Sequence, residues 1–335
     1  MAITHIALAQ GPCMNANSKT PHWADIGEST FVLGIWVLFW VHRWFGRWPF
    51  RLCIYPVVAL HWWTHPHVRQ SSHQYFERLQ AQTGVLGRAP DWRDGIRHLA
   101  LFAETMLDKL VAASGRYPAE NVISTGREAI YEHVQKGQGG MIVTAHMGCL
   151  ELCRILEEKR GLLRLNVLVH TRHAEKFNRI LKRLNPHHDV KLIEVTEVSP
   201  ATAVLLAEKV AAGEFIAIAG DRVPVFASKT VEAQFLGHPA PLPVGPYILA
   251  SLLQCPVYML ACIHEGKGYR LHFTPLADRV VLPRRSREAA MAVYAQRYVD
   301  AMTEVLVQSP YDWFNFFPFW DQIATKTSTD AHVQT

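Results

Sequence analysis

The fold of this chain is decided by residues 141–151, which read Met141-Ile142-Val143-Thr144-Ala145-His146-Met147-Gly148-Cys149-Leu150-Glu151. The first five are apolar and partly β-branched, and they follow the glycine-rich stretch 137–140, a pattern that predicts a buried strand. From Leu150 to residue 158, apolar residues recur at helical spacing, which predicts a helix. The sequence therefore places the imidazole of His146 between a strand and a helix.

A carboxylate, Glu151, follows His146 five residues later. On one helix the two side chains would lie about 140° apart, at roughly 100° per residue. They meet only if His146 ends the strand and Glu151 lies in the first helical turn. An imidazole held by a carboxylate can act as a general base. The alternative is a strand-end histidine beside an acidic residue that suits the helix dipole, and spacing alone favours neither.

Composition narrows the class of protein. The chain has 335 residues, of which 49% are hydrophobic and 19% charged, so it can bury a large core and is not disordered. The net charge of +5 suits an anionic partner without identifying one. Six cysteines without a CxxC pair suit a reducing compartment and argue against a disulfide scaffold or a zinc ribbon. The first thirty residues lack the pattern of a signal peptide, so we expect no export.

The N-terminal part is apolar and aromatic. Two apolar runs, residues 31–41 and 52–63, flank a stretch in which Trp and Phe alternate with Arg43, Arg47 and Arg51. Neither run reaches the roughly 20 residues that span a bilayer. Arginines beside aromatic rings are typical of a helix at the lipid headgroups, so we predict a membrane-associating helical region over residues 1–85. A buried helix pair and a tilted span with a cytoplasmic catalytic domain are the alternatives.

Alternation of strands and helices characterises the rest of the chain. Strands are predicted at 141–145, 166–170, 191–195, 215–219, 256–263 and 269–273. Helices are predicted at 95–112, 126–136, 174–184, 200–212 and 286–307. This order indicates an α/β fold, a mainly parallel mixed sheet flanked by helices, over residues 86–322. Residues 323–335 form a polar tail.

Three predicted strands end in chemically capable residues. The first leads into His146, the second into Arg172, and the third into Asp221 and Arg222. Ligands of open α/β sheets bind beyond the carboxyl ends of the strands. We therefore predict a functional site at this edge of the sheet.

These residues resemble a known family, the bacterial lipid A biosynthesis (late) acyltransferases of the lysophospholipid acyltransferase superfamily. His146 to Glu151 match its HxxxxE motif, Arg172 its second block, and Gly220-Asp221-Arg222 its third. A further block is similar at residues 235–240 and 243–246, and the resemblance covers most of residues 25–320. The ending Trp313-Phe314-Asn315-Phe316-Phe317 is closer to acyltransferases of aryl-polyene-type biosynthetic clusters, which leaves the acceptor open.

The resemblance implies an O-acyltransferase on the cytoplasmic face of the inner membrane. It would move a fatty acyl group from acyl carrier protein or coenzyme A to a hydroxyl of a lipid or glycolipid, without metal or organic cofactor and without nucleic acid. His146 would be the general base and Glu151 its partner. The implied substrate-binding residues are Arg172, Asp221, Arg222, Gly237, Pro243 and Gly245.

The absence of a GxSxG motif argues against a serine nucleophile. Backbone N–H groups at the helix start after His146, assisted by Arg172 or Arg222, are candidates to hold the oxyanion. A lipid esterase or thioesterase that activates water with the same pair is the alternative enzyme, and a lipid carrier is the non-enzymatic one.

Other reactive side chains have plainer interpretations. Cys149 is interpreted as a packing residue rather than a nucleophile. The histidines near position 65 are interpreted as surface groups rather than metal ligands. The basic region 154–191 is either a solvated face or a dock for acidic carrier protein or headgroups. The aromatic residues from Trp313 to Trp320 suit core or interfacial packing, with a lipid tunnel as the alternative.

Overall fold

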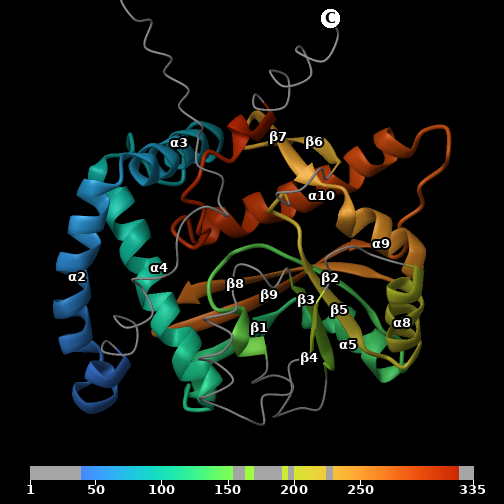
Figure 1. Ribbon diagram of the computed structural model, residues 1–335, viewed down its shortest axis with the longest axis horizontal. Coiled ribbons are helices and arrows are strands. Elements are labelled where there is room, and N and C mark those ends of the chain that lie inside the picture. Colours follow the sequence, from blue (N-terminus) through green and yellow to red (C-terminus); the bar gives the residue numbers. More distant parts are fainter. Residues whose placement is uncertain (1–38, 154–162, 170–190, 195–199, 224–228, 324–335) are drawn as a thin grey trace, which may run out of the picture.

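A seven-stranded sheet forms the centre of the protein (Figure 1). The computed structural model describes residues 39–153, 163–169, 191–194, 200–223 and 229–323. The strand order is β1-β9-β8-β2-β5-β3-β4, and every neighbouring pair is parallel except β8 and β9. The strands are β1 Val122–Thr125, β2 Gly140–Thr144, β3 Leu165–Val169, β4 Lys191–Glu194, β5 Phe215–Ala219, β8 Val257–Glu265 and β9 Gly268–Ala277.

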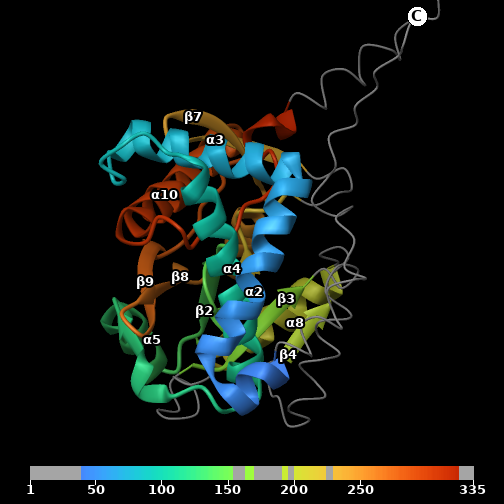
Figure 2. The same cartoon turned by 90° about the vertical axis from the view of Figure 1, so that its left-hand side faces the viewer.

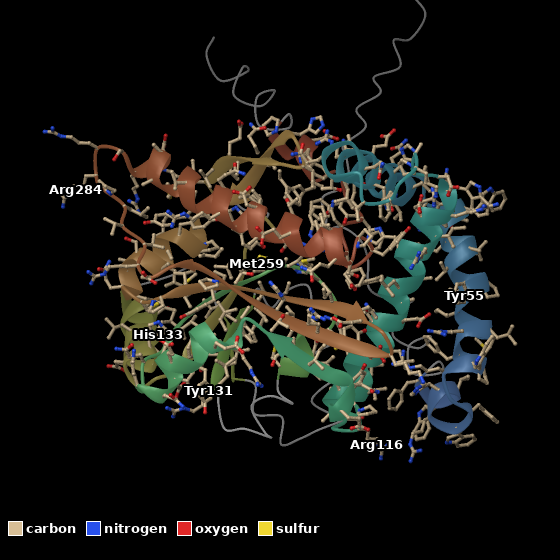
Figure 3. The ribbon with its side chains drawn as sticks, turned by 180° about the vertical axis from the view of Figure 1, so that it is seen from behind. Tyr55, Arg116, Tyr131, His133, Met259 and Arg284 are labelled. Carbon is tan, nitrogen blue, oxygen red and sulfur yellow. The ribbon has the colours of Figure 1, made fainter. Side chains whose placement is uncertain are left out.

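Both faces of this sheet are buried. Along β2, Met141 and Val143 join the core that packs under α8 (Pro200–Ala211), α9 (Gly245–Leu253) and α10 (Arg287–Gln308). Ile142 points to the opposite core, which includes Ile130 of α5 (Arg127–Gln135). Successive side chains of a strand face opposite sides, so a continuous apolar run is what a strand covered on both faces requires. Figure 3 shows Met259 of β8 near the middle of the molecule, between these layers.

Three helices precede the sheet: α2 (Arg47–Thr64), α3 (Pro66–Thr83) and α4 (Trp92–Ala113). α2 runs alongside α4 and is the outer of the two (Figure 2). Its buried residues, Phe50, Ile54 and Val58, pack with α4 in a third apolar cluster. The helix continues through Pro56, and α3 begins at Pro66, in the first turn of a helix where proline is tolerated.

Most of the predicted elements are confirmed, with small shifts at their ends. The sequence misses β1 and a hairpin of β6 (Thr230–Phe235) and β7 (His238–Pro243). β7 reads His-Pro-Ala-Pro-Leu-Pro, and prolines lack the N–H that a central strand needs, so this strand pairs only with β6. The helix predicted from Leu150 begins as a short 3-10 helix, η3 (Leu150–Leu152). Residues 154–162 and the predicted helix 174–184 lie outside the described residues.

The predicted membrane-associating region receives no structural support as a span. Within the described part of the chain, no helix combines the length and the apolar character needed to cross a bilayer. Residues 39–45 are helical and α2 follows, whereas most of the apolar run 31–41 lies outside the described residues. The mixed, mainly parallel sheet flanked by helices is confirmed.

Candidate active site

His146 and Asp221 form a hydrogen-bonded pair at the carboxyl edge of the sheet. β2 and β5 are parallel neighbours with Thr144 opposite Ala219, so His146 and Asp221 each lie two residues beyond a paired strand end. The distance from His146 Nδ1 to Asp221 Oδ1 is 2.7 Å. The prediction that His146 and Asp221 share one edge of the sheet is therefore confirmed.

The carboxylate of Asp221 accepts three N–H groups. Oδ1 faces the ring of His146, and Oδ2 accepts the backbone N–H of His146 at 2.8 Å and the indole N–H of Trp313 at 3.0 Å. A carboxylate has no proton to give, so the hydrogen of the ring lies on Nδ1. Nε2 then carries the lone pair, and it has no hydrogen-bond partner among the described residues. This is the tautomer that a general base needs.

Neighbouring charges and burial favour an ionised Asp221 beside a neutral His146. Burial alone would raise the pKa of Asp221, but the His146 charge and hydrogen bonds, with the Arg222 charge, hold that pKa well below its usual range. Desolvation, and then the cations Arg222 and Lys109, lower the pKa of His146 below 6.5 despite Asp221. The imidazole is therefore neutral at pH 7, and its side chain is 44% exposed.

Glu151, the predicted partner of His146, has a different partner in the structure. It accepts a hydrogen bond from Lys109 Nζ of α4 at 3.2 Å, and the thiol of Cys149 lies 3.6 Å from its other oxygen. The single hydrogen on His146 Nδ1 is donated to Asp221, so the structure shows a His146–Asp221 hydrogen bond in place of the predicted His146–Glu151 bond. A catalytic role for Glu151 stays a prediction.

The C-terminal segment 311–317 crosses the site. Residues 146–148 form an antiparallel bridge with residues 312–314, through Phe314 N to His146 O at 2.9 Å and Gly148 N to Asp312 O at 3.2 Å. Gly148 has φ +52°, and a Cβ there would lie 2.2 Å from the carbonyl oxygen of Cys262. A side chain at this position would therefore push the loop off β8.

Arg222 and Trp313 join this segment to Asp221. The guanidinium of Arg222 donates to Phe314 O at 3.2 Å and lies 5.0 Å from the ring of Phe317. Trp313 is 1% exposed, and Phe317, Phe319 and Trp320 are buried too, so core packing of this aromatic segment is confirmed.

A second His–Asp pair lies on the neighbouring strand. His264, near the end of β8, gives both its backbone N–H and Nδ1 to Asp312, at 2.7 and 2.6 Å. Ser309 Oγ donates to the same carboxylate at 2.5 Å. The His264 ring packs on Tyr269 with centroids 4.2 Å apart, and its side chain is 23% exposed.

The remaining predicted site residues lie in other places. Arg172 is outside the described residues. Gly237 forms the turn of the β6–β7 hairpin with φ +76°, Pro243 ends β7, and Gly245 begins α9. No hydrogen bond or ion pair of the described residues joins these three to His146, and their substrate-binding role stays a prediction.

Two further predictions concern groups after His146. Cys149 is fully buried, and burial followed by the charge of Glu151 raises the pKa of its thiol well above 9.0, as a packing residue requires. The backbone N–H groups of Met147 and Gly148 already donate to Ala145 O and Asp312 O. The predicted oxyanion donors lie further on, at the helix start near Leu150, and their role stays a prediction.

A family comparison covers this whole arrangement. The family model for bacterial lipid A biosynthesis acyltransferases matches residues 96–322. The chain belongs to this family. The match includes His146, Glu151, Asp221 and Trp313, and membership of the lipid A acyltransferase family supports an acyltransferase of lipid biosynthesis. No curated protein matches the chain.

Several residues around the site of this lipid A acyltransferase family member were not predicted from the sequence. Lys109, His264, Asp312 and the indole N–H of Trp313 come from elements distant in sequence. One signal for them was present in the sequence. Asp312 and Trp313 lie inside an aromatic run, and both carry polar groups that need hydrogen-bond partners once they are buried.

Proposed function

We propose that this protein transfers a fatty acyl group from a thioester of acyl carrier protein or coenzyme A to a hydroxyl of a lipid or glycolipid. Membership of the lipid A acyltransferase family supports acyl transfer onto a lipid. The observation that carries the mechanism is the His146–Asp221 pair, with an accessible ring and an unprotonated Nε2.

The reaction follows from that tautomer. Nε2 of His146 removes the proton of the acceptor hydroxyl while the oxygen attacks the thioester carbonyl, so a C–O bond forms. The C–S bond then breaks, and the imidazolium returns the proton to the leaving thiolate. Asp221 keeps the ring oriented and stabilises its charged form, as the aspartate of a catalytic triad does.

Arg222 supplies positive charge beside the base. Its cation lowers the pKa of His146, and in this proposal the same charge stabilises the oxygen that becomes negative when the carbonyl is attacked. Arg172 is the second candidate for this role from the sequence. In this proposal the cation helps the transition state more than the neutral substrate, which is what raises kcat.

The test is acyl transfer by the purified protein. Wild type, His146→Gln and Asp221→Asn are incubated with acyl-carrier protein or acyl-CoA, with and without acceptor lipids, and products are read by mass spectrometry. We expect transfer by wild type and its loss in both variants. Wild-type activity in His146→Gln would overturn the assignment of the base, and fatty acid release without acceptor would identify a hydrolase instead.

The acceptor is the open part of the proposal. Lipid A precursors, other glycolipids and aryl-polyene-type lipids all offer a hydroxyl. Comparing the lipids of cells with and without the gene identifies the product directly. An acylated species that disappears in the deletion and returns with wild type, but not with His146→Gln, is the expected result.

We further propose that α2 lies against the cytoplasmic face of the inner membrane. One of its faces packs on α4, while the opposite face exposes large apolar side chains, including Trp48 at 82% and Trp63 at 77%. Others on this face are Leu52 and Tyr55, and Figure 3 shows Tyr55 at the rim of the molecule. Such a stripe of aromatic residues suits the headgroup level of a bilayer.

The arginines of α2 have a different role from the predicted one. Arg51 forms two hydrogen bonds with Glu104 of α4, at 3.0 and 2.8 Å, and Arg47 pairs with Asp108. These pairs hold α2 on α4 and leave the aromatic stripe to meet the lipid. In vesicle flotation, we expect the double variant Trp48→Ser/Trp63→Ser to bind vesicles less than wild type. The control is Trp92→Ser, which changes an exposed tryptophan at the start of α4 and should leave binding unchanged. Equal binding by the double variant and wild type would contradict this orientation.

A further inference from the structure

Among the described residues, one hydrogen-bond donor to Asp221 does not come from the base that Asp221 orients. Two of its three N–H partners belong to His146 itself, so these bonds move with that residue. The third is the indole N–H of Trp313, 92 residues away in the chain, at 3.0 Å from Oδ2. Of these three bonds, the third ties the carboxylate to a side chain that is independent of His146.

The indole of Trp313 is itself fixed. The rings of Tyr75, Phe235 and Phe319 surround it, with centroids 5.1 to 5.3 Å away and interplanar angles of 74 to 85°. Its carbonyl oxygen accepts a hydrogen bond from Nε2 of the buried His98 at 2.8 Å. Edge-to-face packing and a held backbone leave the ring a single orientation, with its N–H directed at Asp221.

We propose that Trp313 is a positioning residue for the acyl transfer: its indole N–H fixes the carboxylate plane of Asp221 and, through it, the ring of His146. This inference rests on the proposed function for its effect on rate. The geometry it describes is a property of the folded protein and can be measured without any turnover.

The N–H of Trp313 also sets how strongly Asp221 attracts a proton. An N–H donor spreads the negative charge of a carboxylate, so its removal leaves more charge on the oxygen that faces His146. The other charged groups near the ring are Arg222 and Lys109, both of which disfavour the imidazolium. Loss of the indole N–H therefore favours the imidazolium.

The decisive variant is Trp313→Phe, which keeps an aromatic ring and removes the donor. Trp320→Phe is the matched control, because Trp320 packs against two of the same rings, Phe235 and Phe319, but donates to the carbonyl of Phe235 instead. Titration of the His146 ring signal by NMR, assigned with His146→Gln, reads the effect directly. We expect a His146 pKa about half a unit or more above wild type in Trp313→Phe and no change in Trp320→Phe.

The pH profile of acyl transfer gives the second readout. In Trp313→Phe the acid limb of kcat/KM should move to higher pH, and kcat should fall about tenfold, as loss of one charge-assisted hydrogen bond predicts, with KM little changed. If Trp313 were only a packing residue, Trp313→Phe and Trp320→Phe would both lower thermal stability, and neither would shift the acid limb of kcat/KM.

Outcomes separate the two proposals. If Trp313→Phe does not fold, replacing Trp313 with benzothienylalanine, which has sulfur in place of the N–H, keeps the indole shape. A folded variant or analogue whose His146 pKa equals that of wild type overturns the positioning role. A wild-type protein that transfers no acyl group overturns the proposed function and leaves the NMR result standing.

Discussion

The protein holds two histidines in the same way on neighbouring strands. His146 beyond β2 and His264 near the end of β8 each give a backbone N–H and Nδ1 to one buried aspartate, Asp221 or Asp312. Each aspartate accepts one more donor, from Trp313 in the first pair and Ser309 in the second. Described by hydrogen bonds alone, the two pairs are equivalent.

They differ in what surrounds the ring. His146 is 44% exposed, with the cation of Arg222 nearby, whereas His264 is 23% exposed and packs on Tyr269. A general base must reach the proton it removes, so access separates the two roles. We infer that the first pair is built for chemistry and that the second fixes the C-terminal segment, whose Asp312 carbonyl holds Gly148 beside the first.

The largest expected effect comes from the two histidines themselves. His146→Gln should lose about 10²- to 10⁴-fold in kcat, the contribution of a general base, while His264→Gln should keep most of its activity per folded molecule. Steady-state rates, normalised to folded protein by circular dichroism, make the comparison. Similar losses in both variants would show that access does not distinguish the pairs.

The aspartates extend the test. Asp221→Asn should lower kcat by up to about 10⁴-fold, because an amide no longer holds the right tautomer. Asp312→Asn should instead destabilise the protein by about 1–3 kcal/mol, since the carboxylate is 0% exposed and its three donors lose a charged acceptor. Chemical unfolding and kcat together separate the outcomes.

Glu151→Gln tests whether a third carboxylate acts on the base. If Glu151 orients Lys109 rather than His146, the variant should keep the acid limb of its kcat/KM profile near that of wild type. A loss as large as that of Asp221→Asn, in a folded protein, would restore the role predicted for Glu151 from the HxxxxE motif.

His98 links the two pairs, because its Nε2 donates to the carbonyl of Trp313, the residue that follows Asp312 in the chain. Its side chain is fully buried, and burial lowers its pKa to about 4. The unfolded chain binds this proton at pH 6.5 and the folded chain only near pH 4, so stability is present above pH 6.5 and falls as pH drops towards 4. The loss is about 3 kcal/mol for this group. Urea unfolding from pH 7 to 4 should show it, and His98→Gln should flatten that slope.

The smallest effect is expected far from both pairs, at Gly237. Alanine there meets a φ of +76° and the Gln82 side chain at 3.0 Å, so Gly237→Ala should cost about 1 kcal/mol in stability. If the turn is its whole role, KM stays that of wild type. A raised KM without a change in stability would instead support the substrate-binding role that the sequence predicts.

Much of this architecture follows from the order of residues. The apolar runs at 141–145 and 215–219 predict buried parallel strands, and the polar residues after them predict a site at one edge. β1 and the β6–β7 hairpin escape prediction, because a four-residue strand has little periodicity and the prolines of β7 argue against a strand.

The order of residues predicts that His146 and Asp221 lie beyond strand ends at the same edge of the sheet, because alternating strands and helices bring parallel strand ends to one edge. Which carboxylate orients the base was decided only by the tertiary structure. Glu151 is five residues from His146 and Asp221 is seventy-five, yet the distant one makes the bond. Local spacing limits where a side chain can reach, whereas Lys109 and Trp313, brought in from separate elements, select the partner of each carboxylate.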